Sequence, residues 1–294
     1  MPKLQSLNAL MLKQQEKFGL NNSKNFASAK SAETFLESVG MALRYWRTER
    51  LPMASLYQAA WGKIDTPPQK VKGEPGNSSL REEAQRRAIE LTNYLLVTHQ
   101  GIEVNVIADR ISLVHRDLVP SLFVLVRHHR PVTDLSGVSL QARKVFHWME
   151  QNNETTAGAV RKFLGVTVSD LNNDPAYKAL AELQSLLLVD RGPFMMRKEG
   201  IPYLSKEGYP YHCFHLAHQD LVLASARLSL EEAARNFLSG YLRGAVFATD
   251  KKLLSLFGGF LTRIEQDVAL EALLKQKKVS IEKMGRNNIV VFRK

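Results

Sequence analysis

The second half of the chain repeats one short pattern, and this repeat constrains the fold more than any other feature. Residues 155–165 read TTAGAVRKFLG, and residues 248–258 read ATDKKLLSLFG. The second Thr, the penultimate large apolar residue and the final Gly coincide: Thr156 with Thr249, Leu164 with Phe257, and Gly165 with Gly258. A repeat with matching internal spacing indicates that one small structural unit occurs twice.

Each copy stands in the same order of expected elements. An amphipathic helix precedes it, at 139–151 and at 230–242, and apolar residues at helical spacing follow it before a β-prone stretch. Helix, short helix, glycine, helix and hairpin is the order of a winged helix-turn-helix, in which three short helices share one core. The predicted fold is mainly α with small β-hairpins (α+β), built from tandem winged helix-turn-helix units. The alternative is a repeated helical hairpin that binds only protein.

Two β-prone stretches supply the expected wings. Residues 280–294 place Lys283 and Arg286 near a Gly-Arg-Asn-Asn turn, and residues 192–215 hold Arg197 and Lys198. Cations on a hairpin can reach backbone phosphates or the minor groove, or they can be ordinary solvated charges. The aromatic residues of the longer wing can stack on bases or pack beneath the hairpin: Tyr203, Tyr209 and Tyr211.

A metal site near the longer wing is disfavoured. The nitrogen and sulfur donors there are loosely spaced: His212, Cys213, His215 and His218. Adjacent residues of a strand point to opposite faces, so His212 and Cys213 would not share a ligand. We expect neither a metal nor a cofactor.

The first half gives weaker signals. Residues 104–128 are rich in Val, Ile and Leu and fit either a buried helix or strands. The other expected segments are a helix from Leu4 to Gln14, a helix from Ser31 to Val39, a loop at 65–79 and a helix at 80–98. The expected domains are an N-terminal helical region at 1–136, with a divergent winged helix left open, a winged helix with a long wing at 137–225, and a C-terminal winged helix at 226–294.

The charge of the chain favours an anionic partner. The formal net charge is +11 at pH 7, and the excess of Lys and Arg lies in residues 1–78 and 226–294. Double-stranded DNA is the expected partner because each neutralised phosphate releases a counterion, although such an excess also serves plain solubility. The candidate DNA contacts are Arg161, Lys162, Lys178, Lys251, Lys252 and Arg263 in the repeats, and Arg197, Lys198, Lys283 and Arg286 in the wings.

The cysteine count and the lengths of the apolar runs exclude several classes of protein. The chain has one cysteine, which rules out an intramolecular disulfide and a thiolate zinc finger. No apolar run reaches the roughly 18–20 residues that cross a bilayer, and no signal core is visible. We expect a cytoplasmic, nucleoid-associated monomer.

Several short segments resemble one known family. They read AETFLESVGMALRY at 32–45, SLYQAAWG at 55–62, the first repeat, and AARNFLSGYLRGAVFAT at 233–249. In these the chain is similar to the AlkZ/YcaQ superfamily of winged-helix DNA glycosylases, in particular to its AlkZ-related branch. The resemblance implies tandem winged helices that form a concave DNA-binding surface. Active members of the family excise alkylated or crosslinked bases.

The family's catalytic pattern is altered in this chain. That pattern is Gln-x-Gln or Gln-x-Asp after a leucine–glycine pair, and its side chains position a water against the sugar carbon. Leu43 and Tyr45 stand at these two places. A leucine cannot hold a water, and a tyrosine phenol is a poor base at neutral pH. The candidates for the water-positioning role are Glu37 and Tyr45.

Three hypotheses follow. The first is a DNA-binding protein of the glycosylase-like superfamily that lacks the catalytic pair, with a place in DNA repair. The second is an active glycosylase for alkylated or crosslinked bases with an altered site. The third is a winged-helix transcriptional regulator, against which counts that neither a coiled coil nor a ligand-sensing domain is visible.

Overall fold

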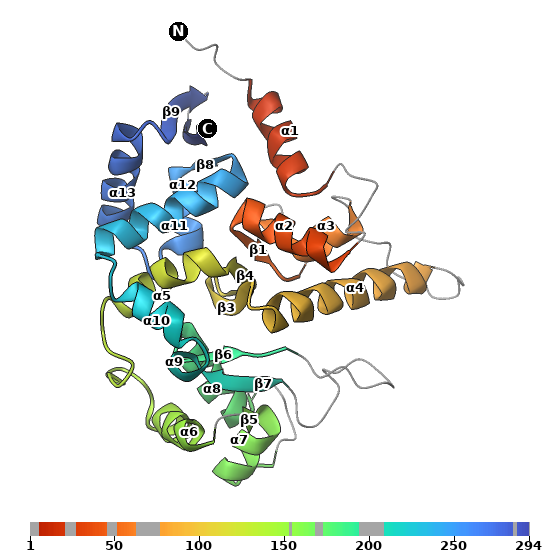
Figure 1. Ribbon diagram of the computed structural model, residues 1–294, viewed down its shortest axis with the longest axis vertical. Coiled ribbons are helices and arrows are strands. Elements are labelled where there is room, and N and C mark those ends of the chain that lie inside the picture. The colour runs from red at the N-terminus through yellow and green to blue at the C-terminus, as the bar shows by residue number, and fades with distance from the viewer. Residues whose placement is uncertain are drawn as a thin grey trace.

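The chain folds into three units with one topology. The structure, a computed structural model, describes residues 6–20, 28–45, 52–62, 77–152, 155–167, 173–193, 209–284 and 287–293. Figure 1 shows the first unit in red to gold at the right, the second in green at the bottom, and the third in blue at the upper left.

The elements of the units run in a common order. The first unit consists of α2 (Ala29–Val39), β1 (Met41–Leu43), β2 (Ala54–Ser55), α3 (Leu56–Trp61), α4 (Asn77–Val97), β3 (Gly101–Ile107) and β4 (Arg110–His115). The second consists of α6 (Leu140–Gln151), β5 (Thr155–Thr156), α7 (Ala157–Leu164), α8 (Pro175–Ser185), β6 (Val189–Arg191) and β7 (Pro210–Cys213). The third consists of α11 (Leu230–Ala245), β8 (Phe247–Thr249), α12 (Asp250–Phe257), α13 (Arg263–Lys275), β9 (Val279–Met284) and β10 (Asn287–Phe292).

The three sheets confirm the predicted winged-helix fold. Their strand orders are β2-β1-β4-β3, β5-β7-β6 and β8-β10-β9. In each, the strand after the first helix pairs antiparallel with the last strand of the hairpin. This is the topology of a winged helix, and it occurs in the first unit as well as in the two units whose repeat the sequence displays.

One capping hydrogen bond recurs at the start of each short helix. The side chain of Ser55 accepts from the Gln58 amide at 3.1 Å, and Thr156 and Thr249 do the same for α7 and α12. Each cap satisfies one of the helix N–H groups that lack an intrahelical partner. The repeated Thr of the sequence is therefore the cap of the second helix of a winged-helix unit.

Residues 104–128 contain both strands and a buried helix, the two structures that their composition allowed. Strands β3 and β4 form a hairpin, and after the short turn η1 (Arg116–Leu118) the helix α5 (Val119–Arg127) follows. The hairpin turns at Ala108 and Asp109, with φ of 50° and 53°. Positive φ at both central residues suits a two-residue turn between twisted strands but is usual only for Gly, Asn and Asp.

The longer wing begins earlier than predicted. Its first strand, β6, lies at Val189–Arg191 and pairs with β7. Arg197, Lys198 and Tyr203 lie outside the described residues.

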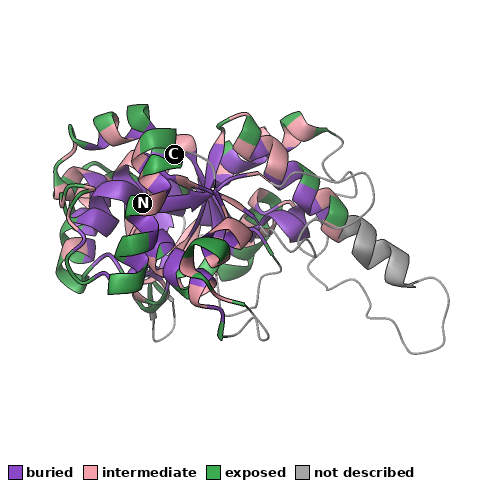
Figure 2. Ribbon diagram, turned by 90° about the horizontal axis from the view of Figure 1, so that it is seen from below, coloured by how far each residue is buried: buried purple, intermediate pink, exposed green. Residues whose placement is uncertain are grey.

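The cores of the units join in different ways. The second unit has a core of its own from residues 135–213, to which α4 adds Ile89. The third unit shares one core with the sheet of the first unit and with α5, so that Phe237 and Leu43 belong to a single apolar cluster, here called the shared core. Figure 2 shows the buried residues gathered along the middle of the molecule. The helices α9 (Phe214–Ala217) and α10 (Gln219–Ser225) connect the second unit to the third.

A close helix contact fixes the third unit on the first. A Cβ added to Gly244 of α11 would lie 2.1 Å from the carbonyl oxygen of Val39, at the end of α2. Only glycine permits two backbones to approach so closely. The hydroxyl of Tyr241, on the same helix, donates to the carbonyl of Pro52 at 2.9 Å.

The first helix of the chain packs on the last unit. Leu10 of α1 (Leu7–Lys17) is fully buried and clusters with Ile289 and Val291 of β10. Gln14 donates to the carbonyl of Ala245 at 2.5 Å. The two ends of the chain are therefore structurally coupled.

Candidate nucleic-acid interface

The exposed lysines of the repeats lie on the second and third helices of the units. Lys162 on α7, Lys178 on α8 and Lys251 on α12 are exposed, and Lys252 is half-buried. Nζ of Lys178 donates to the side-chain oxygen of Asn173, a neutral partner, at 3.4 Å. An exposed lysine can reach a phosphate, and Lys162, Lys178 and Lys251 are exposed in this way.

Strand register brings three predicted cations to one end of the third sheet. Lys283 of β9 pairs with Asn288, and the next residue of β10, Ile289, pairs with Thr249. Thr249 caps α12, whose first turn carries Lys251 and Lys252. Lys251, Lys252 and Lys283 are called the wing-end lysines below. Arg286, in the turn of the same hairpin, lies outside the described residues.

Arg161 contacts other side chains of its own unit. Its Nε lies 2.8 Å from Oδ2 of Asp174, whose side chain is fully buried and also caps α8. The guanidinium stacks over the ring of Tyr177, at 4.9 Å from its centroid. Arg161 therefore joins α7 to the start of α8, and its charge is matched by a carboxylate.

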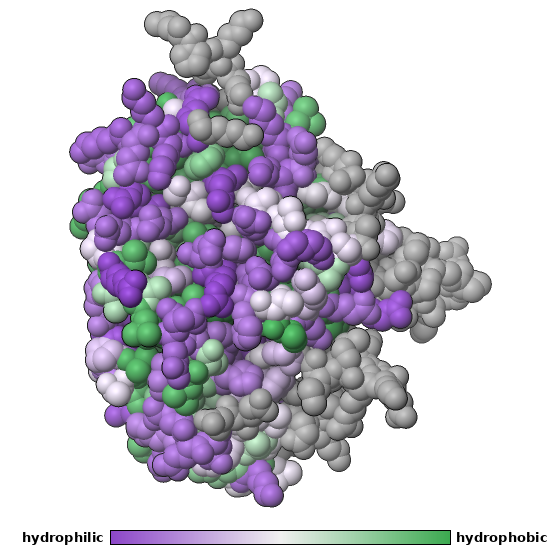
Figure 3. Space-filling model, viewed as in Figure 1, coloured by the Kyte–Doolittle hydropathy of each residue, from purple (hydrophilic) through white to green (hydrophobic). Residues whose placement is uncertain are grey.

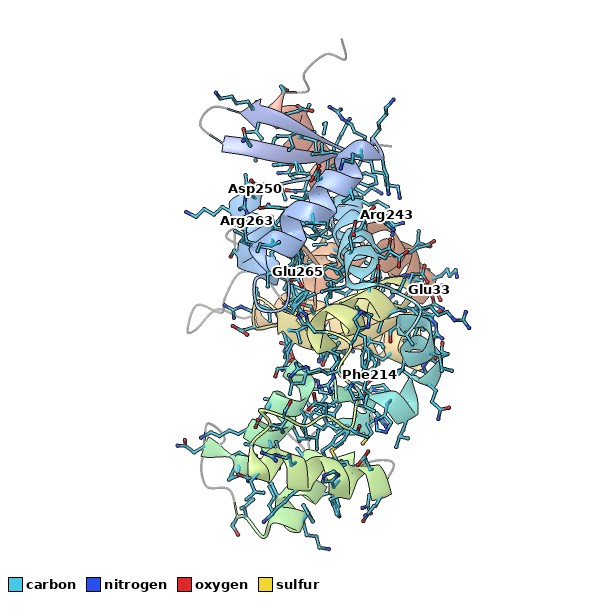
Figure 4. All side chains as sticks on the ribbon, turned by 90° about the vertical axis from the view of Figure 1, so that its left-hand side faces the viewer. Glu33, Phe214, Arg243, Asp250, Arg263 and Glu265 are labelled. Carbon is cyan, nitrogen blue, oxygen red and sulfur yellow. The ribbon has the colours of Figure 1, made fainter. Side chains whose placement is uncertain are left out.

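Arg263 is also matched by carboxylates. Its Nε lies 2.9 Å from Oδ2 of Asp267, and its Nη2 lies 3.6 Å from Oδ2 of Asp250. Figure 4 shows Arg263 beside Asp250 where α12 and α13 begin. Further along α13, Lys275 pairs with Glu271 at 2.9 Å. The outer face of α13 is therefore nearly neutral, and it also exposes Ile264.

The two catalytic candidates have different neighbours. Glu37 is exposed on α2, and its backbone carbonyl accepts from Arg243 at 2.9 Å. Tyr45 follows β1, is 42% exposed, and lies against Arg44. Leu43, at the first catalytic place of the family pattern, is 3% exposed inside the shared core. An apolar core position offers no polar group to hold a water.

A buried charge cluster at the junction of the first and second units escaped the sequence analysis. The carboxylate of Glu103, on β3, accepts from Arg44 at 2.6 Å through one oxygen and from Arg191 of β6 through the other. All three side chains are nearly inaccessible to solvent. A charged residue inside the apolar strand GIEVNVI was the signal that could have revealed it, because a buried charge needs a partner.

Tyr209, which precedes β7, and Tyr211 of β7 lie beside this cluster, so that they pack under the wing. Arg191 lies over the Tyr209 ring, 3.8 Å from its centroid, and Arg44 lies 5.5 Å from the same centroid. Burial alone would lower the pKa of Arg191, but the charge of Glu103 outweighs it and the pKa is raised. Burial raises the pKa of Tyr209, and that of Tyr211 to about 12. Both phenols therefore stay protonated at neutral pH.

The side chains near the longer wing that were considered as metal ligands have separate partners. Nε2 of His218 lies 2.8 Å from Oδ2 of Asp190, and Nε2 of His215 lies 3.6 Å from Oε1 of Glu150. Cys213 is buried. Within the part of the chain that the structure describes, no group of three or more His, Cys, Asp or Glu side chains could hold a metal ion.

The described helices show no candidate for a membrane span. Hydrophilic side chains cover most of the face seen in Figure 3, with hydrophobic ones in small groups.

A comparison with known proteins identifies a solved structure of similar fold. Neither a protein-family model nor a curated protein matches the chain. Among solved structures, the DNA glycosylase AlkZ of Streptomyces sahachiroi matches with a TM-score of 0.55 and 9% sequence identity, over 96% of this chain and 68% of that one. The chain therefore has the fold of the AlkZ DNA glycosylase.

Proposed function

We propose that this protein binds double-stranded DNA through its tandem winged helices and acts in DNA repair without the catalytic pair of the glycosylases. The observation that carries the proposal is the triplicated winged-helix topology in the arrangement of a DNA glycosylase. The units span residues 1–136, 137–225 and 226–294, and the protein is a cytoplasmic monomer. The first unit is a winged helix like the others.

The proposed contacts are the lysines of the repeats and the cations of the wings. Lys162, Lys178 and the wing-end lysines are the described members of this set, and Arg197, Lys198 and Arg286 complete it. Arg161 and Arg263 contribute to the shape of the interface more than to its charge, because each already faces an aspartate.

Salt dependence of duplex binding tests the proposal. We expect the affinity for a fluorescent duplex of about 20 base pairs to fall steeply between about 50 and about 200 mM salt. Replacing the three wing-end lysines by alanine should flatten the slope of log K against log salt by up to about three units, roughly one per lost phosphate contact. The matched control replaces Arg143, Lys144 and Arg227, exposed cations outside the third unit's short helix and wing, and should retain the slope. Binding that does not respond to salt would refute phosphate contact.

An excision assay separates binding from catalysis. With protein in excess over a duplex that carries an alkylated base, we expect no abasic product, because Leu43 is packed in the shared core. Abasic product would show an active enzyme with an altered site, and Glu37→Gln and Tyr45→Phe would then identify the group that positions the water. A two-fold symmetric footprint on undamaged DNA would instead favour a regulator.

A further inference from the structure

Arginine and tyrosine side chains alternate from the first unit into the second. Arg44 stacks over Tyr45 at 5.2 Å and over Tyr209 at 5.5 Å, measured from the guanidinium carbon to the ring centroid. Arg191 lies over the same Tyr209 ring, and its charge acts on the phenol of Tyr211. We call this series, Tyr45–Arg44–Tyr209–Arg191–Tyr211, the Arg–Tyr ladder.

The inner part of the ladder cannot take part in acid–base chemistry. Each oxygen of Glu103 already accepts from an arginine, and the raised pKa of Tyr209 keeps its phenol neutral. The inner ladder is therefore a buried support behind Tyr45.

Only the outer end of the ladder reaches solvent. Tyr45 is 42% exposed, whereas Tyr209 and Tyr211 are buried. Two hydrogen bonds hold the backbone at Tyr45. The hydroxyl of Ser55 donates to the carbonyl of Tyr45 at 2.7 Å, and the amide of Arg44 donates to the carbonyl of Ile111 at 3.0 Å. Tyr45 thus presents a held aromatic ring with a guanidinium behind it, at a junction of two winged helices.

From this arrangement we propose that Tyr45 is a stacking platform for one unpaired nucleobase. This inference rests on the proposed binding of DNA. A base inside a duplex has both faces covered by its neighbours, so only an unpaired base offers a face to the ring. Aromatic side chains bind bases by stacking without sequence preference. Tyr45 is a binding and positioning residue on this proposal, and it carries out no chemistry.

A bulged duplex provides the test. The probes are a fluorescent duplex with one unpaired adenine and the same duplex fully paired. We expect the full-length protein to prefer the bulged duplex by about tenfold, the order of one stacked base. Tyr45→Ala and Tyr45→Leu should lose this preference and keep the affinity for the paired duplex. Tyr45→Phe retains the ring and should keep the preference.

A matched control is available in the second unit. Phe163 is the other Phe, Tyr or Trp side chain that is exposed among the described residues, and it stacks on Trp148 at 4.8 Å. Phe163→Ala should leave the preference unchanged. With 2-aminopurine as the unpaired base, binding should quench its fluorescence, and Tyr45→Leu should abolish the quenching.

The outcomes separate this inference from the proposed function. Salt-sensitive binding of the paired duplex without any preference for the bulge would overturn the role of Tyr45 and leave DNA binding intact. Equal losses in Tyr45→Ala and Phe163→Ala would overturn it as well. Absence of binding to either duplex would refute the proposed function itself.

Discussion

Glu103 decides whether two arginines can remain buried. Its carboxylate is 2% exposed and serves both Arg44 and Arg191. Replacement of a buried ion-pair partner leaves an uncompensated charge in a medium that solvates it poorly. We therefore expect Glu103→Gln to lower the free energy of unfolding by roughly 3–5 kcal/mol, measured by urea denaturation. Glu271→Gln, in an exposed pair with Lys275, should change it little. Equal effects of the two substitutions would contradict the importance of burial.

Cys213 reports on the same junction through its reactivity. The thiol is 2% exposed, and burial raises its pKa to about 12. At pH 8 only about 10⁻⁴ of it is thiolate, which is the form that reacts. Alkylation by iodoacetamide should therefore be very slow in the native protein and fast in urea, as measured by intact mass. The chain has no other cysteine, so a second modified thiol cannot confuse the result. Rapid labelling of the native protein would contradict the burial of β7.

Single residues show where sequence patterns suffice and where they do not. The pair of Arg263 and Asp267 follows helical spacing and could have been predicted from four-residue separation. The pair of Arg161 and Asp174 joins two elements across a loop, which no periodic pattern encodes. The same holds for Glu103, whose partners come from different units. Local spacing therefore identifies ion pairs within one helix and misses buried pairs between elements.

Among the elements, the short second helices depend on their caps. Thr156→Ala and Thr249→Ala should each cost about 1 kcal/mol of stability, because an amide of the first turn loses its acceptor. Ser55→Ala should cost about 2 kcal/mol, because Ser55 also donates to the carbonyl of Tyr45. Urea denaturation measures all three. Ser255, exposed within α12, is the control, since Ser255→Ala removes no cap and alanine favours helix. A loss for Ser255→Ala as large as for Thr249→Ala would argue against the caps.

The element order was predictable in the second half because two equally long copies confirm each other. The first unit was harder to recognise, since its segment from Ser55 to Gly62 is two residues shorter than the repeat. The first residue of its hairpin turn, Ala108, is also not one that usually adopts a positive φ. Ala108 holds a positive φ with tertiary support, because its amide donates to the carbonyl of Leu256 in the third unit at 3.1 Å. A turn that another unit stabilises leaves no local signal.

At the scale of the whole molecule, repeat boundaries and folding boundaries differ. The second unit has a core of its own, which includes Phe146 and Leu180, and among the described residues it takes Ile89 from α4 and Leu135 from the preceding segment. The third unit needs residues from elsewhere. Leu10 of α1 packs on β10, and Leu122 of α5 packs in the shared core. A unit that leaves large apolar surfaces uncovered does not reach the burial that a stable domain requires.

Two fragments test this difference. Residues 130–225 should fold alone, with cooperative thermal unfolding and a near-ultraviolet circular dichroism signal from packed aromatic rings. Residues 226–294 should show neither, because they lose the helices that cover their core. Within the full chain, Leu10→Ala should cost roughly 2–5 kcal/mol and Leu12→Ala, at a 59% exposed position, much less. Cooperative unfolding of the 226–294 fragment would mean that its helices bury enough surface by themselves, and the coupling of the chain ends would then serve the placement of the units and not their folding.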